Sequence, residues 1–173
     1  MLKLNSVSTP WIWLILSVLA TLPIIYLNKS EQAIRIQGGD IDCQWSEPDF
    51  TLKWRHSVEK QYWQEYYHMD GTQLRLTKTF IQTFGAGTPS VGAVIPAPEG
   101  YIGLSSDVLL PKIHWVVSRN MQGTILGQHG SLPIYERVED YTEIQISSEE
   151  HPKWFWLIKE SCHDRHAHTK HSS

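Results

Sequence analysis

Three ionisable side chains, His56, Glu65 and Lys78, fall within an aromatic stretch that alternates like half-buried strands. Counting alternate residues places all three on the apolar face of those strands. Glu65 and Lys78 are then diagonal neighbours, and we expect an ion pair between them because buried charges must be paired or neutralised. Ionisable groups gathered on an inner face could form a pocket. The competing interpretation is an ion pair that is merely tolerated within an aromatic core.

The motif HSVEK begins at His56 and contains further polar candidates. His56 and Ser57 are adjacent strand residues whose side chains point to opposite faces, so they cannot easily share a proton as a nucleophilic dyad. A histidine at a strand end usually satisfies a carbonyl of the following turn. We therefore expect no enzyme and no catalytic residues. The candidates for binding a ligand or partner are His56, Ser57, Glu59, Lys60, Glu65 and Lys78.

A glycine-rich stretch, TFGAGTPS, follows the aromatic strands. Gly85 and Gly87 permit positive φ, and their amides could approach an anion to which Thr88 adds a hydroxyl group. The stretch lacks the length and the lysine of a phosphate-binding loop, so a tight structural turn is the competing interpretation. Gly85, Gly87 and Thr88 complete the set of candidate binding residues.

Histidines gather in the polar tail of residues 161–173, which contains His163, His166, His168 and His171. Such a tail could capture a transition metal, but its spacing matches no structural zinc pattern and closing it around an ion costs entropy. We expect no metal site and no cofactor, with these histidines as weak candidates. Cys43 and Cys162 could pair in an oxidising compartment or remain separate thiols, and both possibilities stay open.

Two turns set the register of the aromatic strands. A turn centred on Val58–Glu59 places Trp54 opposite Trp63. The dipeptide Asp70-Gly71, a strong hairpin signal, places Tyr67 opposite Leu74. Both turns agree on one apolar face, which also carries Phe80.

Short strand-like segments separated by turn signals run through residues 41–160. They predict an all-β domain, either an antiparallel sandwich or a flattened barrel, in which residues 153–160 (KWFWLIKE) form a strand. Residues 28–40 are interpreted as a polar tether that ends at Gly38-Gly39. The formal net charge of -3 provides no basic surface for nucleic acid.

An apolar run without charged side chains, Trp11–Leu27, precedes the tether. As a helix it would be about 26 Å long, slightly short of a hydrocarbon core of about 30 Å. Aromatic residues near its ends suit membrane interfaces. We expect a single transmembrane helix over residues 11–27 after a cytoplasmic N-terminus of residues 1–10. A cleaved signal peptide is the alternative, and either places the β domain outside the cytoplasm.

Two motifs, FTLKWRHSVEKQYWQEYY and LTKTFIQTFGAGTP, resemble the bacterial family catalogued as domain of unknown function 1850. The resemblance covers roughly Cys43 to Ile158. Members of this family are small exported or membrane-anchored proteins, often encoded beside tripartite ATP-independent periplasmic (TRAP) transporters of the TAXI type. The family supplies no catalytic residues, and the histidine-rich tail lies outside the resemblance.

The resemblance implies an accessory protein of the inner membrane, with its β domain on the periplasmic side. The expected partners are a membrane or solute-binding subunit of a transporter, and the lipid bilayer through Trp11–Leu27. The alternative is a free-standing periplasmic domain that binds a small ligand or anion without catalysis. An exposed apolar patch on a closed core would favour the transporter partner, whereas a large buried pocket would favour the ligand binder.

Overall fold

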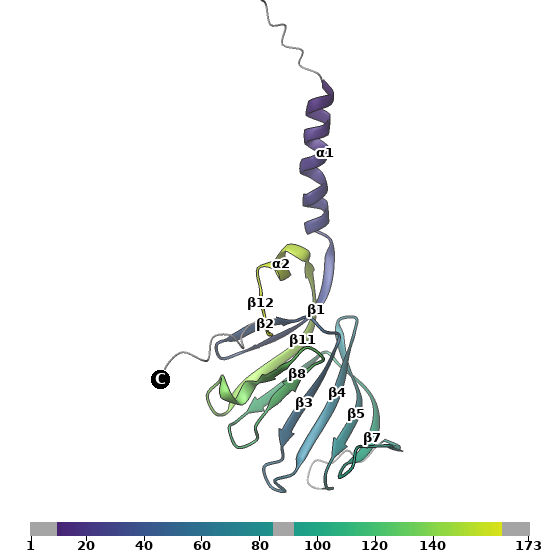
Figure 1. Cartoon of the computed structure of the whole chain (residues 1–173), viewed down its shortest axis with the longest axis vertical. Helices are drawn as coiled ribbons and strands as arrows, with labels where there is room; N and C mark the ends of the chain where they lie inside the picture. The colour runs from purple at the N-terminus through teal and green to yellow at the C-terminus, as the bar shows by residue number, and fades with distance from the viewer. Residues whose placement is uncertain (1–9, 85–91, 164–173) are drawn as a thin grey trace, which may run out of the picture.

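The computed structural model describes residues 10–84 and 92–163, and combines one projecting helix with a β domain (Figure 1). Helix α1 (Pro10–Leu27) extends away from the domain. The β domain consists of two open sheets rather than a closed barrel, so the all-β prediction is confirmed in its sandwich form. Among the described residues, no helix has both the length and the apolar character needed to cross a membrane.

The strands are arranged in two sheets whose spatial orders differ from the chain order. Sheet A contains, in spatial order, β12 (Glu160–Ser161), β2 (Ile41–Trp45), β1 (Ser30–Gly38), β11 (Thr142–Pro152) and β8 (Lys112–Val117). Sheet B contains, in spatial order, β10 (Ser131–Pro133), β9 (Thr124–Leu126), β3 (Asp49–Arg55), β4 (Tyr62–Asp70), β5 (Gln73–Ile81), β7 (Ile102–Leu110) and β6 (Val94–Ile95). A 3-10 turn, η1 (Ile134–Glu136), and a short helix, α2 (Lys153–Leu157), complete the described elements.

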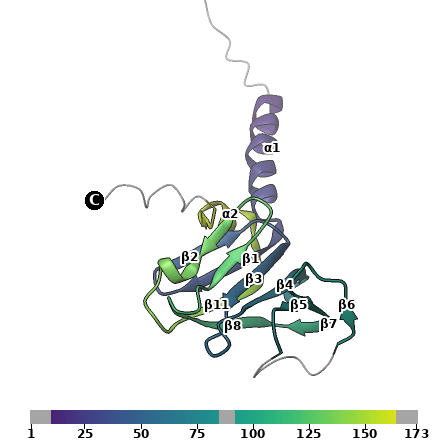
Figure 2. The same ribbon diagram turned by 60° about the horizontal axis from the view of Figure 1, so that its bottom comes forward.

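The main core lies between the two sheets and is built from alternate residues of facing strands. Ile34 and Ile146 contribute from sheet A, and Leu52 and Ile125 from sheet B, all 1% exposed or less. The side of sheet B formed by β5, β7 and β6 extends beyond sheet A (Figures 1 and 2). A second, smaller cluster packs there, formed by Trp63, Ile81 and Leu104.

The predicted tether is wrong, because Ser30–Gly38 forms strand β1 between β2 and β11. Ala33, Ile34 and Ile36 are buried, while the intervening polar residues made the segment look like a linker. Gly38 has φ of 153°, and a Cβ atom there would lie 2.3 Å from the Glu143 carbonyl oxygen. The two glycines therefore serve the β1–β2 turn rather than ending a tether.

The predicted strand over residues 153–160 is also wrong, because α2 occupies Lys153–Leu157 and only Glu160–Ser161 pairs as β12. Pro152, with φ of -57°, precedes the helix and donates no hydrogen bond, as suits a helix start. A short apolar run between turn signals fits a strand or a buried helix equally well by periodicity. The sequence pattern therefore could not separate the two.

The predicted register of the first aromatic hairpin is confirmed, since Trp54 pairs with Trp63 and Phe50 with Tyr67. The register of the second hairpin is wrong. Asp70 pairs with Gln73, so the turn residues are Gly71 and Thr72, and Tyr67 lies opposite Leu76. A register shift between Tyr66 and Tyr67 then moves the rest of β5 by one residue, which exchanges its faces.

Candidate functional site

The HSVEK motif forms the connection between β3 and β4, closed by backbone hydrogen bonds at both ends. The His56 amide donates to the Gln61 carbonyl at 2.8 Å, and the Lys60 amide donates to the His56 carbonyl at 3.0 Å. Lys60 adopts φ of 57°, a left-handed conformation that reverses the chain. Val58 projects from this turn and is 73% exposed. The motif therefore presents an apolar side chain on a fixed turn.

The His56 ring is held inside this turn. It stacks on Trp63 with ring centroids 5.0 Å apart, and its Nδ1 atom contacts the carboxylate of Glu59. The amides of Val58 and Glu59 approach the same nitrogen at 3.4 Å each. Because Nδ1 must carry a proton to donate to the carboxylate, these two long approaches contribute little. His56 and Glu59 thus support the turn, although the ring contacts a carboxylate and not the turn carbonyl that the sequence suggested.

The expected ion pair between Glu65 and Lys78 is not formed, because the register shift turns Lys78 to the outer face of sheet B. Lys78 pairs with Tyr66, and its Nζ atom lies 4.5 Å from the centroid of the Tyr66 ring. Phe80, predicted on the inner face, also lies beside Tyr66, at 5.1 Å between centroids. One shifted residue in β5 therefore separates two of the three ionisable candidates.

Glu65 remains on the inner face, between the main core and the smaller cluster. Its carboxylate accepts a hydrogen bond of 2.7 Å from the hydroxyl of Tyr67. Burial raises the pKa of Glu65 above its ordinary value, although this hydrogen bond lowers it. Burial and the nearby carboxylate also raise the pKa of Tyr67. Within the described part of the chain, Trp63 Nε1 and Thr79 Oγ1 are buried without a partner, and Thr79 lies opposite Glu65.

The glycine-rich motif begins at the same end of sheet B as the HSVEK turn. Trp63 pairs with Ile81, and the Tyr62 amide donates to Gln82 Oε1 at 2.7 Å. Phe84 follows and is 62% exposed. Gly85, Gly87 and Thr88 lie outside the described residues, so their proposed contacts stay a prediction. The end of sheet B formed by residues 56–61 and 82–84, here called the distal motif face, lies farthest from α1 (Figure 1).

A shallow groove crosses the outer face of sheet B, with a volume of about 330 Å³. Tyr66, Lys78 and Gly127 are among the residues that line it. The other lining residues are Asp49, Phe50, Thr51, Tyr67, Thr77, Leu126 and Gln128. Lys78 thus contributes to a surface groove, where the sequence placed it in the core.

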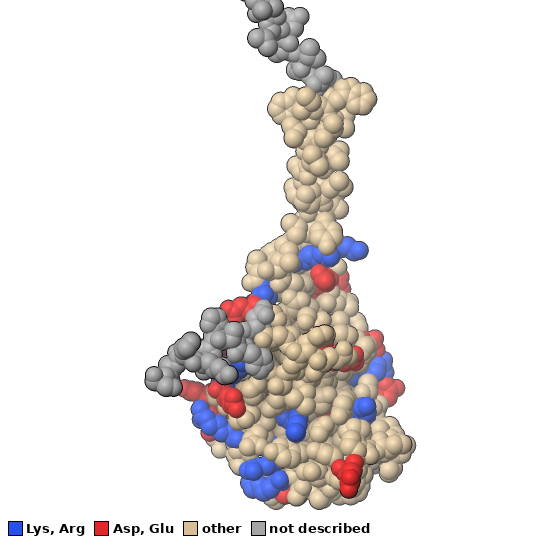
Figure 3. Space-filling view, in the orientation of Figure 1, with Lys and Arg blue, Asp and Glu red and all other residues tan. Residues whose placement is uncertain are grey.

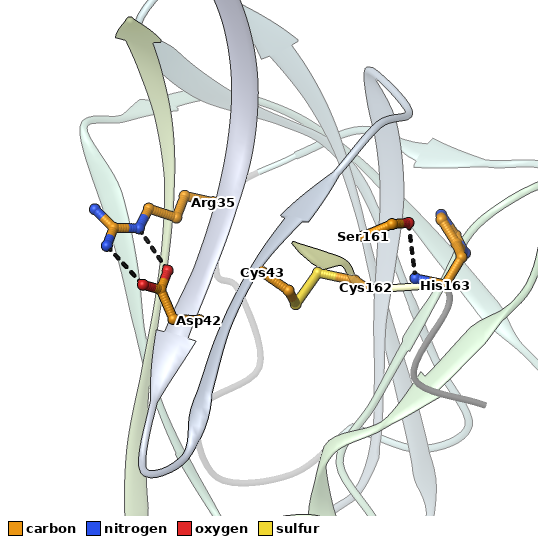
Figure 4. The surroundings of a disulfide bond; sticks show 6 residues. All are labelled: Arg35, Asp42, Cys43, Ser161, Cys162 and His163. Atoms are coloured by element: carbon orange, nitrogen blue, oxygen red, sulfur yellow. Dashed lines mark hydrogen bonds and ion pairs between the residues drawn. A yellow bond between two sulfur atoms is a disulfide. The ribbon is translucent and has the colours of Figure 1, made fainter. Parts of the chain in front are cut away.

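Cys43 of β2 and Cys162 form a disulfide, which resolves the possibility that the sequence left open (Figure 4). Their Cα atoms are 5.1 Å apart, and both residues are fully buried. The Cys162 amide donates to the Gln44 carbonyl at 2.9 Å, as part of the parallel pairing of β12 with β2. The bond joins residues separated by 119 positions.

The start of the histidine-rich tail packs against a buried carboxylate that the sequence analysis missed. The ring of His163 lies 4.3 Å from that of Trp45, and its Nε2 atom lies 3.4 Å from Glu47. Glu47 is 6% exposed and also accepts hydrogen bonds from the amides of Gln128 and His129. Burial raises the pKa of Glu47, but the two amides and the His129 side chain together lower the pKa overall.

The expectation that the tail holds no metal site stays a prediction, with its histidines as weak candidates. Among the described residues, no group of three His, Cys, Asp or Glu side chains is placed to hold a metal ion. His166, His168 and His171 lie outside those residues. His163 is already engaged with Trp45 and Glu47. The sequence offered no signal for that contact, because Glu47 stands in a turn-rich segment far from the tail.

Comparisons with known proteins identify a family and nothing closer. No curated protein matches the chain, and no solved structure matches it either. The model of a domain of unknown function (DUF1850) matches residues 50–134. This segment begins in β3 and ends where η1 begins, so it contains the HSVEK turn, the glycine-rich motif and most of sheet B. Residues 50–134 therefore form a domain of the DUF1850 family, which the two motifs resemble.

Proposed function

We propose that the chain is a membrane-anchored accessory protein of the bacterial envelope whose β domain contacts a solute transporter from outside the cytoplasm. The observation that carries this proposal is the polarity of the molecule (Figure 1). An apolar helix projects from one end, and the described loop residues of the two family motifs, 56–61 and 82–84, lie at the opposite end. Such an arrangement suits a domain held at a membrane by one end and binding a partner with the other.

The exposure of α1 supports insertion into lipid. Trp11, Leu14, Leu19 and Ile25 are each more than 60% exposed, and the other large apolar side chains of the helix are also exposed. Lipid would remove these side chains from water, at a gain of about 25 cal/mol for each Å² buried. An 18-residue helix rises about 27 Å. A helix slightly shorter than the hydrocarbon core is accommodated by local thinning of the bilayer.

The disulfide supports a location outside the cytoplasm. Protein disulfides persist in oxidising compartments such as the bacterial periplasm and are rare in reducing cytosol. The bond between Cys43 and Cys162 is buried and closes a long segment of chain, as is typical of a structural disulfide. We therefore propose the inner membrane as the location, with the β domain on the periplasmic side.

The distal motif face supports binding to a protein partner. Val58 and Phe84 are large apolar side chains, exposed by 73% and 62%, on loops at one end of a rigid sheet. Loops held by a rigid scaffold commonly carry binding residues. Confinement to the membrane raises the effective concentration of a membrane partner, so a small interface would suffice. The transporter as partner rests on the genomic association of the family that the motifs resemble.

Co-purification in mild detergent tests this proposal. We expect the tagged full-length protein to retain transporter subunits, and V58D or F84D to lose them without loss of folding. The matched control is L109D. Leu109 is 42% exposed and pairs with Arg75, near the end of sheet B opposite to the distal motif face. Solute uptake should fall in a strain that lacks the protein. Normal uptake together with no retained transporter subunit would reject the transporter role.

A second candidate function, binding of a small anion, is favoured by the groove at Lys78. Its ammonium group lies beside the aromatic rings of Tyr66 and Phe80. Within residues 10–84 and 92–163, no carboxylate forms an ion pair with it, so its charge is available to an anion. Calorimetric titration with small carboxylates and phosphate would detect such binding. We expect K78M to abolish any heat signal, and K112M, on the other sheet, to leave it unchanged.

A further inference from the structure

Helix α2 lies at the foot of α1 and is fastened to the β domain by its own backbone and one tryptophan (Figure 1). The Lys153 amide donates to the Lys29 carbonyl at 3.0 Å. Trp156 is 4% exposed, and its Nε1–H group donates to the Glu31 carbonyl at 2.9 Å. Because Trp156 fixes the inner side of α2, the opposite side of the helix must face away from the domain.

The outward side of α2 is apolar. Trp154, Leu157 and Ile158 stand at positions i, i+3 and i+4, which share one side of a helix. They are 45%, 73% and 73% exposed. The β domain therefore leaves three neighbouring large apolar side chains in contact with solvent. We call these three residues the α2 apolar face.

The α2 apolar face adjoins the end of α1. The Lys153 ammonium group donates to the hydroxyl of Tyr26 at 3.0 Å and lies 4.2 Å from the centroid of its ring. Tyr26 is in the last turn of α1, and the exposed Lys29 follows it by three residues. Lys and Arg side chains are visible directly below the helix in Figure 3. Tryptophan and tyrosine beside lysine is the composition that prefers the interface between lipid and water.

We propose that Trp154, Leu157 and Ile158 dock into the surface of the bilayer that receives α1, with Lys29 and Lys153 facing its headgroup phosphates. This inference rests on the proposed insertion of α1. A bilayer is favoured over a protein partner because the apolar surface is continuous with α1. The basic residues beside it also complement anionic lipid. Short amphipathic segments bind at this depth by burying one apolar side.

Docking of α2 would give the β domain a second contact with the membrane and so fix its tilt. A domain held by one helix and the short link to β1 could otherwise rotate about that link. With α2 seated in the interface, the distal motif face points away from the bilayer, toward the part of a partner that protrudes from the membrane. The α2 apolar face is thus a positioning surface for the contact proposed above.

Label depth in the full-length protein tests the inference. In variants L157C and I158C the introduced cysteine is a free thiol beside the Cys43–Cys162 disulfide. Each variant is labelled there with the fluorophore nitrobenzoxadiazole under non-reducing conditions and reconstituted into nanodiscs of phosphatidylcholine and phosphatidylglycerol. The matched control is V58C, because Val58 is also 73% exposed but lies on the distal motif face. We expect blue-shifted emission at positions 157 and 158, and strong quenching by lipids that carry a headgroup spin label. The label at position 58 should behave as in water.

Two other outcomes separate this inference from the anchor. If the protein resists carbonate extraction but labels at positions 157 and 158 match the one at position 58, α1 is inserted and the α2 contact is rejected. If the protein is extracted by carbonate, both the anchor and the inference that rests on it are rejected. A second variant, L157S/I158S, guards against label artefacts. Spin-labelled lipid should quench a label at position 154 (W154C) much less in the L157S/I158S background than in the otherwise unchanged protein.

Discussion

At the scale of single residues, Glu65 is a carboxyl group whose charge is opposed by burial. It lies between two hydrophobic clusters and receives one hydrogen bond, from Tyr67. Burial raises its pKa in the folded protein above that in the unfolded chain. Its contribution to stability is therefore fully present below the unfolded pKa and is lost as the pH rises through the folded pKa.

Replacement of Glu65 by glutamine should stabilise the protein at pH 8 and change little at pH 4. Glutamine keeps the shape and can accept the Tyr67 hydroxyl, but it carries no charge to desolvate. Thermal unfolding measured across this pH range gives the result directly. The control Y67F removes the donor and should cost about 0.5–1.5 kcal/mol. Equal pH dependence in wild type and E65Q would show that Glu65 is solvated.

Lys78 offers the opposite test, because the sequence and the structure disagree about it. On the outer face, K78M removes contacts with Tyr66 and Phe80 and should cost no more than about 1 kcal/mol. Had Lys78 been paired with Glu65 inside the core, its removal would cost roughly 3–5 kcal/mol. Urea unfolding distinguishes the two values. A loss in the larger range would restore the inner-face pairing.

At the scale of elements, the two hairpins show what the sequence could and could not predict. The register of β3 and β4 was predictable because aromatic alternation on both strands and the position of the turn agree. The register of β4 and β5 was not, since a two-residue turn displaced by one position and a bulge near Tyr66 leave local composition unchanged, while the bulge exchanges the faces of β5. The disulfide was undecidable because pairing depends on a distance that only the fold sets.

The site candidates follow the same division. The two motifs were recognisable in the sequence. The structure brings residues 56–61 and 82–84 of these motifs to one end of sheet B, through the pairing of Trp63 with Ile81. Glu47 and the α2 apolar face were missed, because each gains its meaning from contacts with segments more than 70 residues away, at Gln128 and at Glu31. Such long-range contacts have no signature in a short window of sequence.

The disulfide should be the strongest single constraint among the short elements. Because it closes a loop of more than 100 residues, its loss should cost about 4–5 kcal/mol by chain entropy. The C43S/C162S double variant, compared with wild type in urea unfolding, measures this cost without leaving a free thiol. Equal midpoints under non-reducing conditions would mean that the bond is absent from the native protein.

An ion network beside β12 gives the elements a predictable acid response. Hydrogen bonds from Arg35 lower the pKa of Asp42 to about 2, against burial, and Lys159 adds to the effect (Figure 4 shows the Arg35 pair). A depressed carboxyl pKa stabilises the fold above the unfolded pKa of about 3.9. This stability is lost as the pH falls toward 2. D42N should therefore lower the melting temperature at pH 7 and show a shallower decline below pH 4.

At the scale of the whole molecule, we propose that the two opposite ends have different neighbours. One end carries α1 and the α2 apolar face, which we assign to lipid. The other end carries the distal motif face, which we assign to a transporter subunit. The β domain between them has a continuous core and a buried disulfide, so it can hold the two surfaces at a fixed separation.

Photocrosslinking in living cells tests this central claim most directly. A photoreactive benzoylphenylalanine is placed at Val58 or Phe84, and at the exposed Leu109 as the control near the opposite end of sheet B. We predict that positions 58 and 84 crosslink to one transporter subunit, which mass spectrometry identifies, and that position 109 does not. Crosslinking to that subunit from position 109 alone, or no transporter adduct from positions 58 and 84, would contradict the account.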